Sequence, residues 1–170
     1  VPDPSKGNYV YDEAAENVES GNIAGNGSLV LKVYFKQQFT VTYEPGTHGT
    51  FKTQTTEELD YGDDTPAAPK TTGEAGYTFE GWEPTVESTV TADATYVAQW
   101  SANTDTKYTV EYYYQENGKY PTTATSSVER AGETDTTANV TAEDKVPDPS
   151  KGNYVYDEAA ENVESGNIAG

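Results

Sequence analysis

The sequence predicts a mainly β protein, with at most a minor α component, built from small modules in tandem. Three observations support this fold class. Residues 1–25 recur letter for letter as residues 146–170. Apolar and polar residues alternate with period two along most of the chain, as they do in half-buried strands. Sustained helical periodicity is scarce, so strands are expected to supply most of the regular structure.

The duplicated text indicates a tandem repeat with a period of 145 residues, the distance from Val1 to Val146. A shared packing requirement would fix the apolar letters alone, yet the polar and charged letters match as well. Solenoid units run roughly 20–50 residues, so this period fits an array of small domains better. In the parent protein we therefore expect residues 26–37 to recur after residue 170, and text like residues 107–145 to precede residue 1.

Composition excludes several classes of partner. The chain has 10 Lys and Arg against 29 Asp and Glu, a net charge of -19. Nucleic acids and anionic membrane surfaces require a basic face, so neither is expected as a partner. The absence of cysteine excludes disulfides and thiolate chemistry. No apolar run approaches the roughly 20 residues of a membrane span, and membrane insertion is not expected.

Several segments carry clear strand patterns. The pattern in residues 39–44 stops at Pro45-Gly46, a turn dipeptide. The pattern from residue 108 stops at Asn117-Gly118, a strong hairpin signal. The residues expected to share a face are Leu29, Leu31, Val33 and Phe35; Phe39, Val41 and Tyr43; Tyr96, Ala98 and Trp100; and Tyr108, Val110, Tyr112 and Tyr114.

Helical text is limited to two short candidates. Residues 12–20 can place Ala14, Ala15 and Val18 on one face, with Asp12 as cap, but an irregular acidic loop is a close alternative. Residues 136–144 form the second and weaker candidate.

One complete module spans residues 38–102. Its segments VTYEPGTHGTF, AGYTFEGWEP and TVTADATYVAQW resemble the internalin-type B repeat, also called the Listeria-Bacteroides repeat. The segment after Trp82 is shorter than in many members of that family. The residues that match the family pattern are Gly76, Tyr77, Phe79, Gly81, Trp82, Ala98, Gln99 and Trp100.

A second module is divided between the two ends of the sequence. Its opening KYTVEYYYQENG, its GNYVYD box and its closing VLKVYF resemble the mucin-binding-protein-like (MucBP-like) repeats of Gram-positive surface proteins. Residues 1–37 would be the C-terminal half of one such module. Residues 107–170 would be the N-terminal part of the next one, without its last strand.

These resemblances imply a fold and a location. Both families have small β-grasp, ubiquitin-like folds, and arrays that alternate the two resemble stalks of cell-wall-anchored adhesins. The resemblance therefore implies an extracellular position on the bacterial cell wall. Repeat identity, acidity and the lack of recognisable sites favour a structural stalk over two other hypotheses: a repeat that binds a host glycoprotein such as mucin or immunoglobulin, and an enzyme or calcium-dependent module.

No catalytic, cofactor-binding or metal-ligating residues are predicted. The single histidine, His48, lies in a turn without a recognisable nucleophile partner. Residues 60–66 offer carboxylates for calcium but lack the spacing of an EF-hand loop. A Lys-Asn isopeptide crosslink requires residue types that the chain has in Lys32, Lys107 and Asn103, although their spacing singles out none of them. We therefore expect no enzyme activity.

Aromatic side chains outside the core are the candidates for ligand contacts, because rings stack on sugars and anchor protein interfaces. Trp82 and Trp100 are expected in or near the core. The candidates are Tyr61, Tyr113 and Tyr120, with ordinary exposed tyrosine as the alternative. Copy number would add avidity to any such binding.

The divided module also predicts head-to-tail association between molecules. Open strand edges accept strands from other chains, so residues 1–37 of one chain are expected to complete residues 107–145 of the next. Residues 146–170 would then compete with residues 1–25 for the same place. The interface residues predicted for this exchange are Leu29, Leu31, Val33, Phe35, Tyr108, Val110 and Tyr112.

Overall fold

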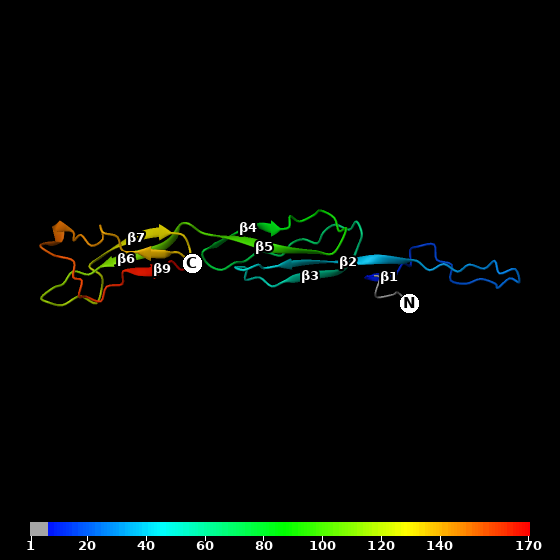
Figure 1. Ribbon diagram of the computed structural model, residues 1–170, viewed down its shortest axis with the longest axis horizontal. Coiled ribbons are helices and arrows are strands. Elements are labelled where there is room, and N and C mark those ends of the chain that lie inside the picture. Colours follow the sequence, from blue (N-terminus) through cyan, green and yellow to red (C-terminus); the bar gives the residue numbers. More distant parts are fainter. Residues whose placement is uncertain (1–6) are drawn as a thin grey trace. The chain divides into compact units, whose positions relative to one another are not determined.

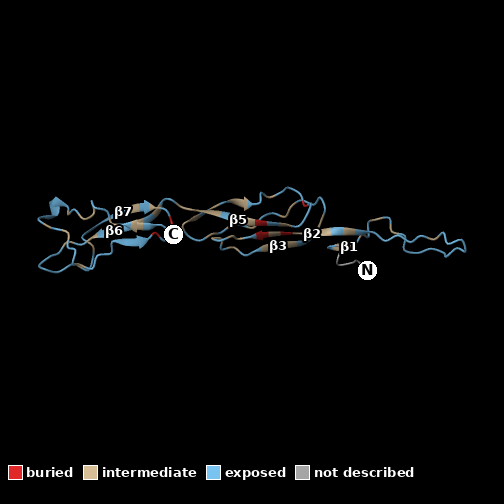
Figure 2. Cartoon of the chain, in the orientation of Figure 1, coloured by how far each residue is buried: buried red, intermediate tan, exposed pale blue. Residues whose placement is uncertain are grey.

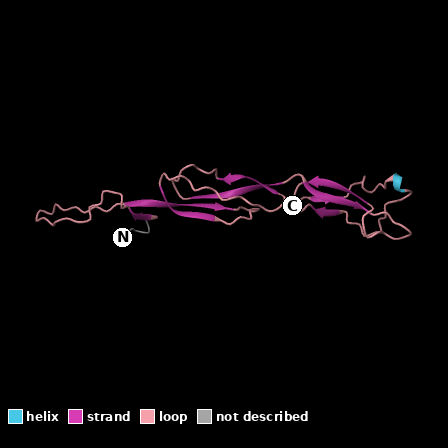
Figure 3. Cartoon of the chain, turned by 180° about the vertical axis from the view of Figure 1, so that it is seen from behind, coloured by secondary structure: helices cyan, strands magenta, loops and turns pink. Residues whose placement is uncertain are grey.

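Strands dominate both compact units of the chain. The computed structural model describes residues 7–170 (Figure 1). Unit 1 comprises Val1–Thr72 and Gly81–Gln99, and unit 2 comprises Gly73–Glu80 and Trp100–Gly170. Throughout residues 7–170 the regular structure is strand, apart from a 3-10 turn at Pro149–Lys151 (Figure 3). The predicted mainly β class is confirmed, whereas its minor α component is not.

A mixed five-stranded sheet is organised around one long strand. Its strands are β1 (Tyr9–Tyr11), β2 (Phe35–Glu44), β3 (Gln54–Asp60), β4 (Tyr77–Glu83) and β5 (Ala94–Ala102). The order is β1-β2-β5-β4, with β3 also paired to β2. Strand β2 runs antiparallel to β1 and β3 and parallel to β5. The continuous strand β2 therefore crosses the position, after residue 37, where the sequence predicted a module boundary.

Alternation along β2 and β5 builds the core of unit 1. Phe39, Val41 and Tyr43 are 6%, 2% and 1% exposed, and they cluster with Val90 and Tyr96 (Figure 2). The predicted alternation in β2 is confirmed because its inward side chains are buried and its threonines are not.

Aromatic rings pack against one another in both units. The Trp82 ring lies 4.9 Å from that of Tyr43 and 5.9 Å from that of Phe51. Trp100 in unit 2 is half-buried and its ring lies 5.5 Å from that of Phe79. The two tryptophans thus lie in or beside packed regions, as expected from the sequence.

Strand β3 was not predicted. Its text, QTTEELD, has no large apolar residue before Leu59, so the period-two signal is weak. The strand forms because β2 offers backbone partners along this edge, in register from Gln38↔Asp60 to Tyr43↔Gln54 with one irregularity. Backbone pairing, rather than side-chain burial, places this segment in the sheet.

The turns predicted from the sequence contain residues with positive φ angles. Gly46, after β2, has φ of 68°. At the predicted hairpin, Asn117 and Gly118 have φ of 49° and 75°. Glu116 and Lys119 exchange two backbone hydrogen bonds, of 2.8 and 3.0 Å, across this turn. Both turn predictions are confirmed.

The helix candidates are not helical. Residues 12–17 form an irregular turn, followed by an isolated bridge between Val18 and Lys32, so the alternative of an acidic loop is correct. Residues 136–144 contain strand β8 (Thr137–Asn139) instead of a helix. Residues of both segments pair through their backbone with distant parts of the chain. A helix of two turns with weak helical preference is too short to compete with that pairing.

Unit 2 contains two small sheets. Strand β6 (Thr106–Tyr112) pairs antiparallel with β7 (Ser126–Gly132), and β8 pairs antiparallel with β9 (Ser165–Asn167). Next to β9, Ile168 is 4% exposed and packs on Gly132, where an added Cβ would lie 2.4 Å from Ile168 Cδ1. Glycine at position 132 therefore permits the burial of Ile168.

The packing of unit 1 predicts that two substitutions of Tyr43 lower the free energy of unfolding by different amounts. The Tyr43 hydroxyl donates to the carbonyl of Pro66 at 2.8 Å. Tyr43→Phe should cost about 1 kcal/mol by removing that partly buried hydrogen bond. Tyr43→Ala should cost about 3–5 kcal/mol by leaving a cavity. Urea denaturation followed by Trp82 fluorescence, in a Trp100→Phe background, measures both.

The control for this pair is Tyr61→Phe, because Tyr61 is 72% exposed. It should change the free energy of unfolding by less than about 0.5 kcal/mol. Equal effects of Tyr43→Phe and Tyr43→Ala would contradict the assignment of Tyr43 to the packed core.

Candidate interaction surfaces

The duplicated segment adopts the same turn in both copies, which we call the first copy (residues 1–25) and the second copy (residues 146–170). Asp12 Oδ1 accepts a hydrogen bond from the amide two residues later at 3.1 Å, and Asp157 Oδ1 does the same at 3.0 Å. The side-chain amide of Asn17 donates to the Asp12 carbonyl at 2.6 Å, and that of Asn162 to the Asp157 carbonyl at 2.9 Å. This turn is therefore specified locally.

A tyrosine-glutamate contact also repeats. The hydroxyl of Tyr11 donates to Glu19, and that of Tyr156 donates to Glu164. The accepting carboxylate stabilises the protonated phenol, which raises the pKa of Tyr11 to about 12 and raises the pKa of Tyr156. The same side-chain contact thus fixes both copies beyond the turn.

Strand pairing differs between the copies. In the first copy, β1 pairs with the start of β2, with Val10 opposite Lys36, and Val18 bridges Lys32. In the second copy, the strand lies later, at β9, which pairs with β8. Residues 154–156, which match β1 in sequence, form no strand.

The exposure of two apolar residues also differs between the copies. One residue is better covered in the first copy, and the other is better covered in the second. Val18 is 37% exposed, but its counterpart Val163 is 84% exposed. Ile23 is 91% exposed, but its counterpart Ile168 is 4% exposed. Each copy therefore makes a part of the contacts that this text is able to make.

Tyrosines of unit 2 hold the second copy in place. The Tyr114 ring lies 5.0 Å from that of Tyr154, edge to face, and its hydroxyl accepts the amide of Asp148 at 2.9 Å. Tyr120 donates to Asp157 at 2.7 Å, which lowers the pKa of that carboxyl. These contacts tether the second copy without using the backbone of residues 154–156.

A saturated ion pair joins β6 and β7 to the segment after β8. Arg130 binds both carboxylate oxygens of Asp144, with Nη1 2.8 Å from Oδ2. Tyr112 donates to Oδ1 at 2.6 Å, and the amide and hydroxyl of Thr141 each donate to Oδ2 at 2.8 Å.

The Arg130 guanidinium, with help from Tyr112 and Thr141, holds the pKa of Asp144 well below its usual range. The pKa of Arg130 is raised by the same pair. The Asp144 side chain is 2% exposed. Because its oxygens are fully engaged by the protein, this cluster acts as a structural clamp.

Residues 26–37, which we call the arm, present apolar side chains to solvent. Leu29 is half-buried and touches Gly21, where an added Cβ would lie 2.5 Å from Leu29 Cδ1. The exposed members are Val30 (65%), Leu31 (51%), Val33 (55%), Tyr34 (42%) and Phe35 (40%). Adjacent exposed apolar side chains of this kind mark interaction surfaces.

The residues predicted for strand donation lie on separate elements. Leu31, Val33 and Phe35 are exposed in the arm, whereas Leu29 is half-buried there. Tyr108, Val110 and Tyr112 are half-buried on one face of β6, as the alternation predicted. The sequence did not predict the Arg130–Asp144 clamp, because nothing in its text marks a pairing across 14 residues.

The three tyrosines predicted as ligand contacts are all exposed. Tyr61 is 72% exposed and its ring lies 6.5 Å from that of Phe39. Tyr113 is 43% exposed and donates to Glu111 at 2.6 Å, while Tyr120 is 40% exposed and donates to Asp157. They lie on different segments, and their role in ligand binding stays a prediction.

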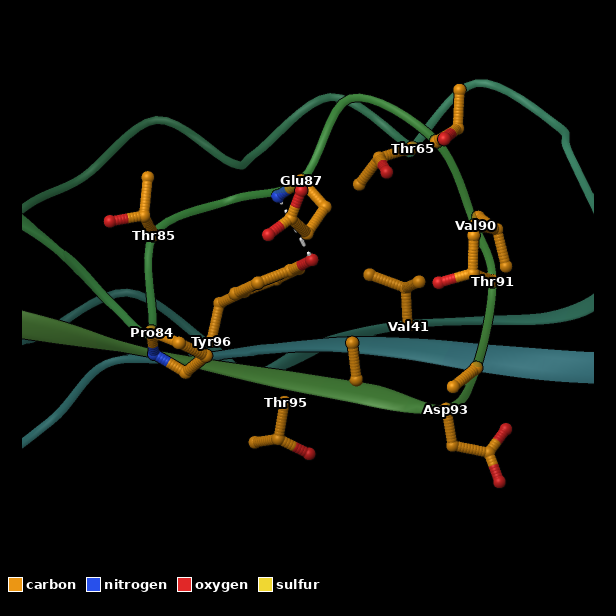
Figure 4. A pocket seen from close by; sticks show the side chains of 13 residues that line it. Val41, Thr65, Pro84, Thr85, Glu87, Val90, Thr91, Asp93, Thr95 and Tyr96 are labelled. Carbon is orange, nitrogen blue, oxygen red and sulfur yellow. Dashed lines mark hydrogen bonds between the residues drawn. The ribbon is translucent and has the colours of Figure 1, made fainter.

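An open pocket in unit 1 has a volume of about 320 Å³ (Figure 4). It lies between Val41, Thr65 and residues 84–96, which comprise the loop before β5 and the start of that strand. Tyr96 accepts the amide of Glu87 at 3.2 Å within it, and the Thr65 hydroxyl is buried with no hydrogen-bond partner. The side chains that line the pocket present both methyl and hydroxyl groups, and their arrangement matches no recognisable class of ligand.

Residues considered for calcium or crosslink chemistry have other contacts. The Asp63 carboxylate accepts the Asp60 amide at 2.8 Å, and Asp60 pairs with Lys36. Lys107 lies 3.6 Å from Glu129, and Asn103 accepts from Thr78 at 2.6 Å. Among residues 7–170, no three His, Cys, Asp or Glu side chains gather as a metal-binding group.

Over the described residues, no helix is long and apolar enough to cross a membrane. The chain matches no family model, no curated protein and no solved structure.

The clamp predicts a pH-dependent stability of unit 2. Asp144→Asn should cost about 3 kcal/mol, because it leaves Arg130 without its charge partner. The folded pKa of Asp144 lies below its unfolded value, so its stabilisation is complete above about pH 4 and is lost as the pH falls below that. Urea denaturation followed by Trp100 fluorescence, in a Trp82→Phe background, should show the gap between the two proteins shrinking at acid pH.

A matched control is available on the same pair of strands. Glu129 forms an exposed ion pair with Lys107, with side chains 67% and 62% exposed. Glu129→Gln should change stability by less than about 0.5 kcal/mol. An equal loss in the two variants would refute the special role of Asp144.

Proposed function

We propose that the chain is a repeat-region segment of a Gram-positive cell-surface adhesin, serving as a stalk that projects an adhesive domain. The observation that carries this proposal is the unchanged recurrence of 25 residues at a period of 145. Duplication of whole modules reproduces surface and core letters alike. Repetition of small modules lengthens a protein without requiring a new fold, which is what a stalk needs.

The strand arrangement supports the proposed module type. Residues 38–102 carry the B-repeat motifs, and β2 and β5 form a central parallel pair flanked by β3 and β4. A central parallel pair with one strand added on each side is compatible with a β-grasp-like module. We propose that residues 1–37 and 107–170 are parts of MucBP-like modules in the same array.

The net charge supports an extended arrangement of the repeats. A net charge of -19 produces mutual repulsion between neighbouring modules and disfavours collapse of an array. We propose a cell-wall location and a mechanical rather than enzymatic role. The Asp144 clamp and the core around Tyr43 then serve to keep each module folded.

The stalk function predicts how size depends on copy number. Proteins with one, two and four 145-residue repeats should show a maximum dimension, by small-angle X-ray scattering, that grows in proportion to repeat number. Mutual repulsion and a fixed length per repeat are the reasons. A maximum dimension that levels off with added repeats would contradict a stalk.

The alternative is that the repeats themselves bind a host glycoprotein, favoured by the exposure of Tyr61, Tyr113 and Tyr120. The triple alanine variant should then lose at least about tenfold in apparent affinity for mucin-coated or immunoglobulin-coated surfaces, because stacked rings are typical binding anchors. A variant with Tyr9→Ala, in β1, is the aromatic control. Binding unchanged by the triple variant would exclude these tyrosines as the site.

A further inference from the structure

We propose that Asn117 is a site of spontaneous deamidation, which converts it to aspartate and isoaspartate, whereas Asn26 is protected by its own turn. These two residues form the Asn-Gly sequences of the chain. The co-reactant is water, and no enzyme is required. This inference does not depend on the proposed stalk function, because it rests on the chemistry of two turns.

The reaction has two steps that balance without an oxidant or a reductant. The backbone nitrogen of Gly118 attacks Cγ of Asn117 and gives up its proton, a carbon–nitrogen bond forms, and the amide group of the side chain leaves as ammonia. Water then opens the resulting succinimide ring at one of its two carbonyl carbons. One opening gives aspartate. The other gives isoaspartate, in which the main chain runs through the former side chain.

The residue after each asparagine decides how easily this attack occurs. Glycine has no side chain to hinder its own nitrogen, and its backbone adopts more conformations than that of any other residue. The other asparagines of the chain are each followed by Val, Ile, Thr or Tyr, whose side chains are branched or bulky beside the reacting nitrogen. The thermal lability of asparagine is therefore concentrated at Asn26 and Asn117.

At Asn117 both reacting groups are open to solvent. Asn117 and Gly118 are exposed, and a Cβ added to Gly118 would meet no atom within 4 Å. The turn is closed by its outer residues, because Glu116 and Lys119 exchange two backbone hydrogen bonds. Among the described residues, the Gly118 amide and the Asn117 side chain have no hydrogen-bond partner. The nucleophile can therefore attack without first breaking a hydrogen bond.

At Asn26 the same two groups are engaged. The amide of Gly27 donates to the carbonyl of Ala24 at 3.0 Å. The side-chain oxygen of Asn26 accepts the amide of Ser28 at 3.1 Å. The nitrogen must give up its bond to Ala24 before it can attack, and the side chain is held in one orientation by Ser28. Both contacts slow the reaction at this site.

The difference between the two sites is local. The hydrogen bonds that define each turn join residues that lie within two positions of its asparagine. Each Asn-Gly pair therefore carries its own protection or lack of it, whatever the rest of the fold contributes. A comparison of the two sites in one molecule tests the turns themselves.

The products would change the tip of this hairpin. Isoaspartate lengthens the main chain between Glu116 and Lys119, which weakens the two hydrogen bonds that close the turn. Either product adds a carboxylate beside Glu116, in a chain that already has a net charge of -19. Tyr114 and Tyr120 flank the tip and bind the second copy. The modified tip would hold that segment less firmly.

Ageing of the full chain in mildly alkaline buffer tests the proposal. Peptide mapping by mass spectrometry measures aspartate and isoaspartate at both positions over time. Conversion should be at least about fivefold faster at Asn117 than at Asn26, because two hydrogen bonds oppose the reaction at Asn26. In urea, where both turns are unfolded, the two rates should become similar. This control separates the effect of structure from that of the Asn-Gly sequence.

A matched pair of variants identifies the source of the product. Anion-exchange chromatography of the aged protein resolves the species that carries the added charge. Asn117→Gln should remove most of this species, because glutamine would have to close a larger ring. Asn26→Gln should leave it nearly unchanged. Circular dichroism checks that each variant is folded.

Three outcomes would overturn the proposal. They are equal rates at the two asparagines of the folded chain, faster conversion at Asn26, and an Asn117 that is converted in urea but not in the folded chain. The last result would show that the hairpin protects its own asparagine. If Asn117→Gln does not fold, the rates at the two positions of the unmodified chain decide the question.

Discussion

The backbone pairing of β2 is the constraint on which unit 1 depends. The ten residues of this strand pair with three other strands, β1, β3 and β5. Only with these partners in place do Phe39, Val41 and Tyr43 point together into one core. Strand β3 shows the strength of this constraint, because its polar text enters the sheet through backbone hydrogen bonds. The arm continues the same strand outward, so core and interaction surface share one element.

Unit 2 is stabilised in a different way. Within its described residues only Thr134 and Ile168 are buried, at 3% and 4% exposure, and a unit of this size can bury only a modest core. Polar side chains compensate: Asp144 binds both Arg130 and Tyr112, and Tyr114 and Tyr120, which follow β6, bind the second copy. Such contacts are directional, which explains why the duplicated segment is held at particular positions and left exposed at others. The high exposure of Val155 and Val163 in the second copy is a consequence of this anchoring.

The proposed stalk draws on a general property of repeat proteins. Modules that contact mainly their neighbours can be repeated without altering the fold. The net charge of -19 produces repulsion between the modules of such an array and disfavours its collapse. The exposed apolar side chains of the arm favour a covered state.

The sequence by itself determined the mainly β class, the alternation in β2, β5 and β6, and the turns at Gly46 and Asn117-Gly118. It also determined the turn after Asp12, which recurs after Asp157, because its donors and acceptors lie within six residues of each other. Only tertiary structure decided the place of β3, the Arg130–Asp144 clamp, and the opposite burial of Ile23 and Ile168. Strand pairing needs a partner from a distant part of the chain, so identical text acquires different neighbours and a different structure.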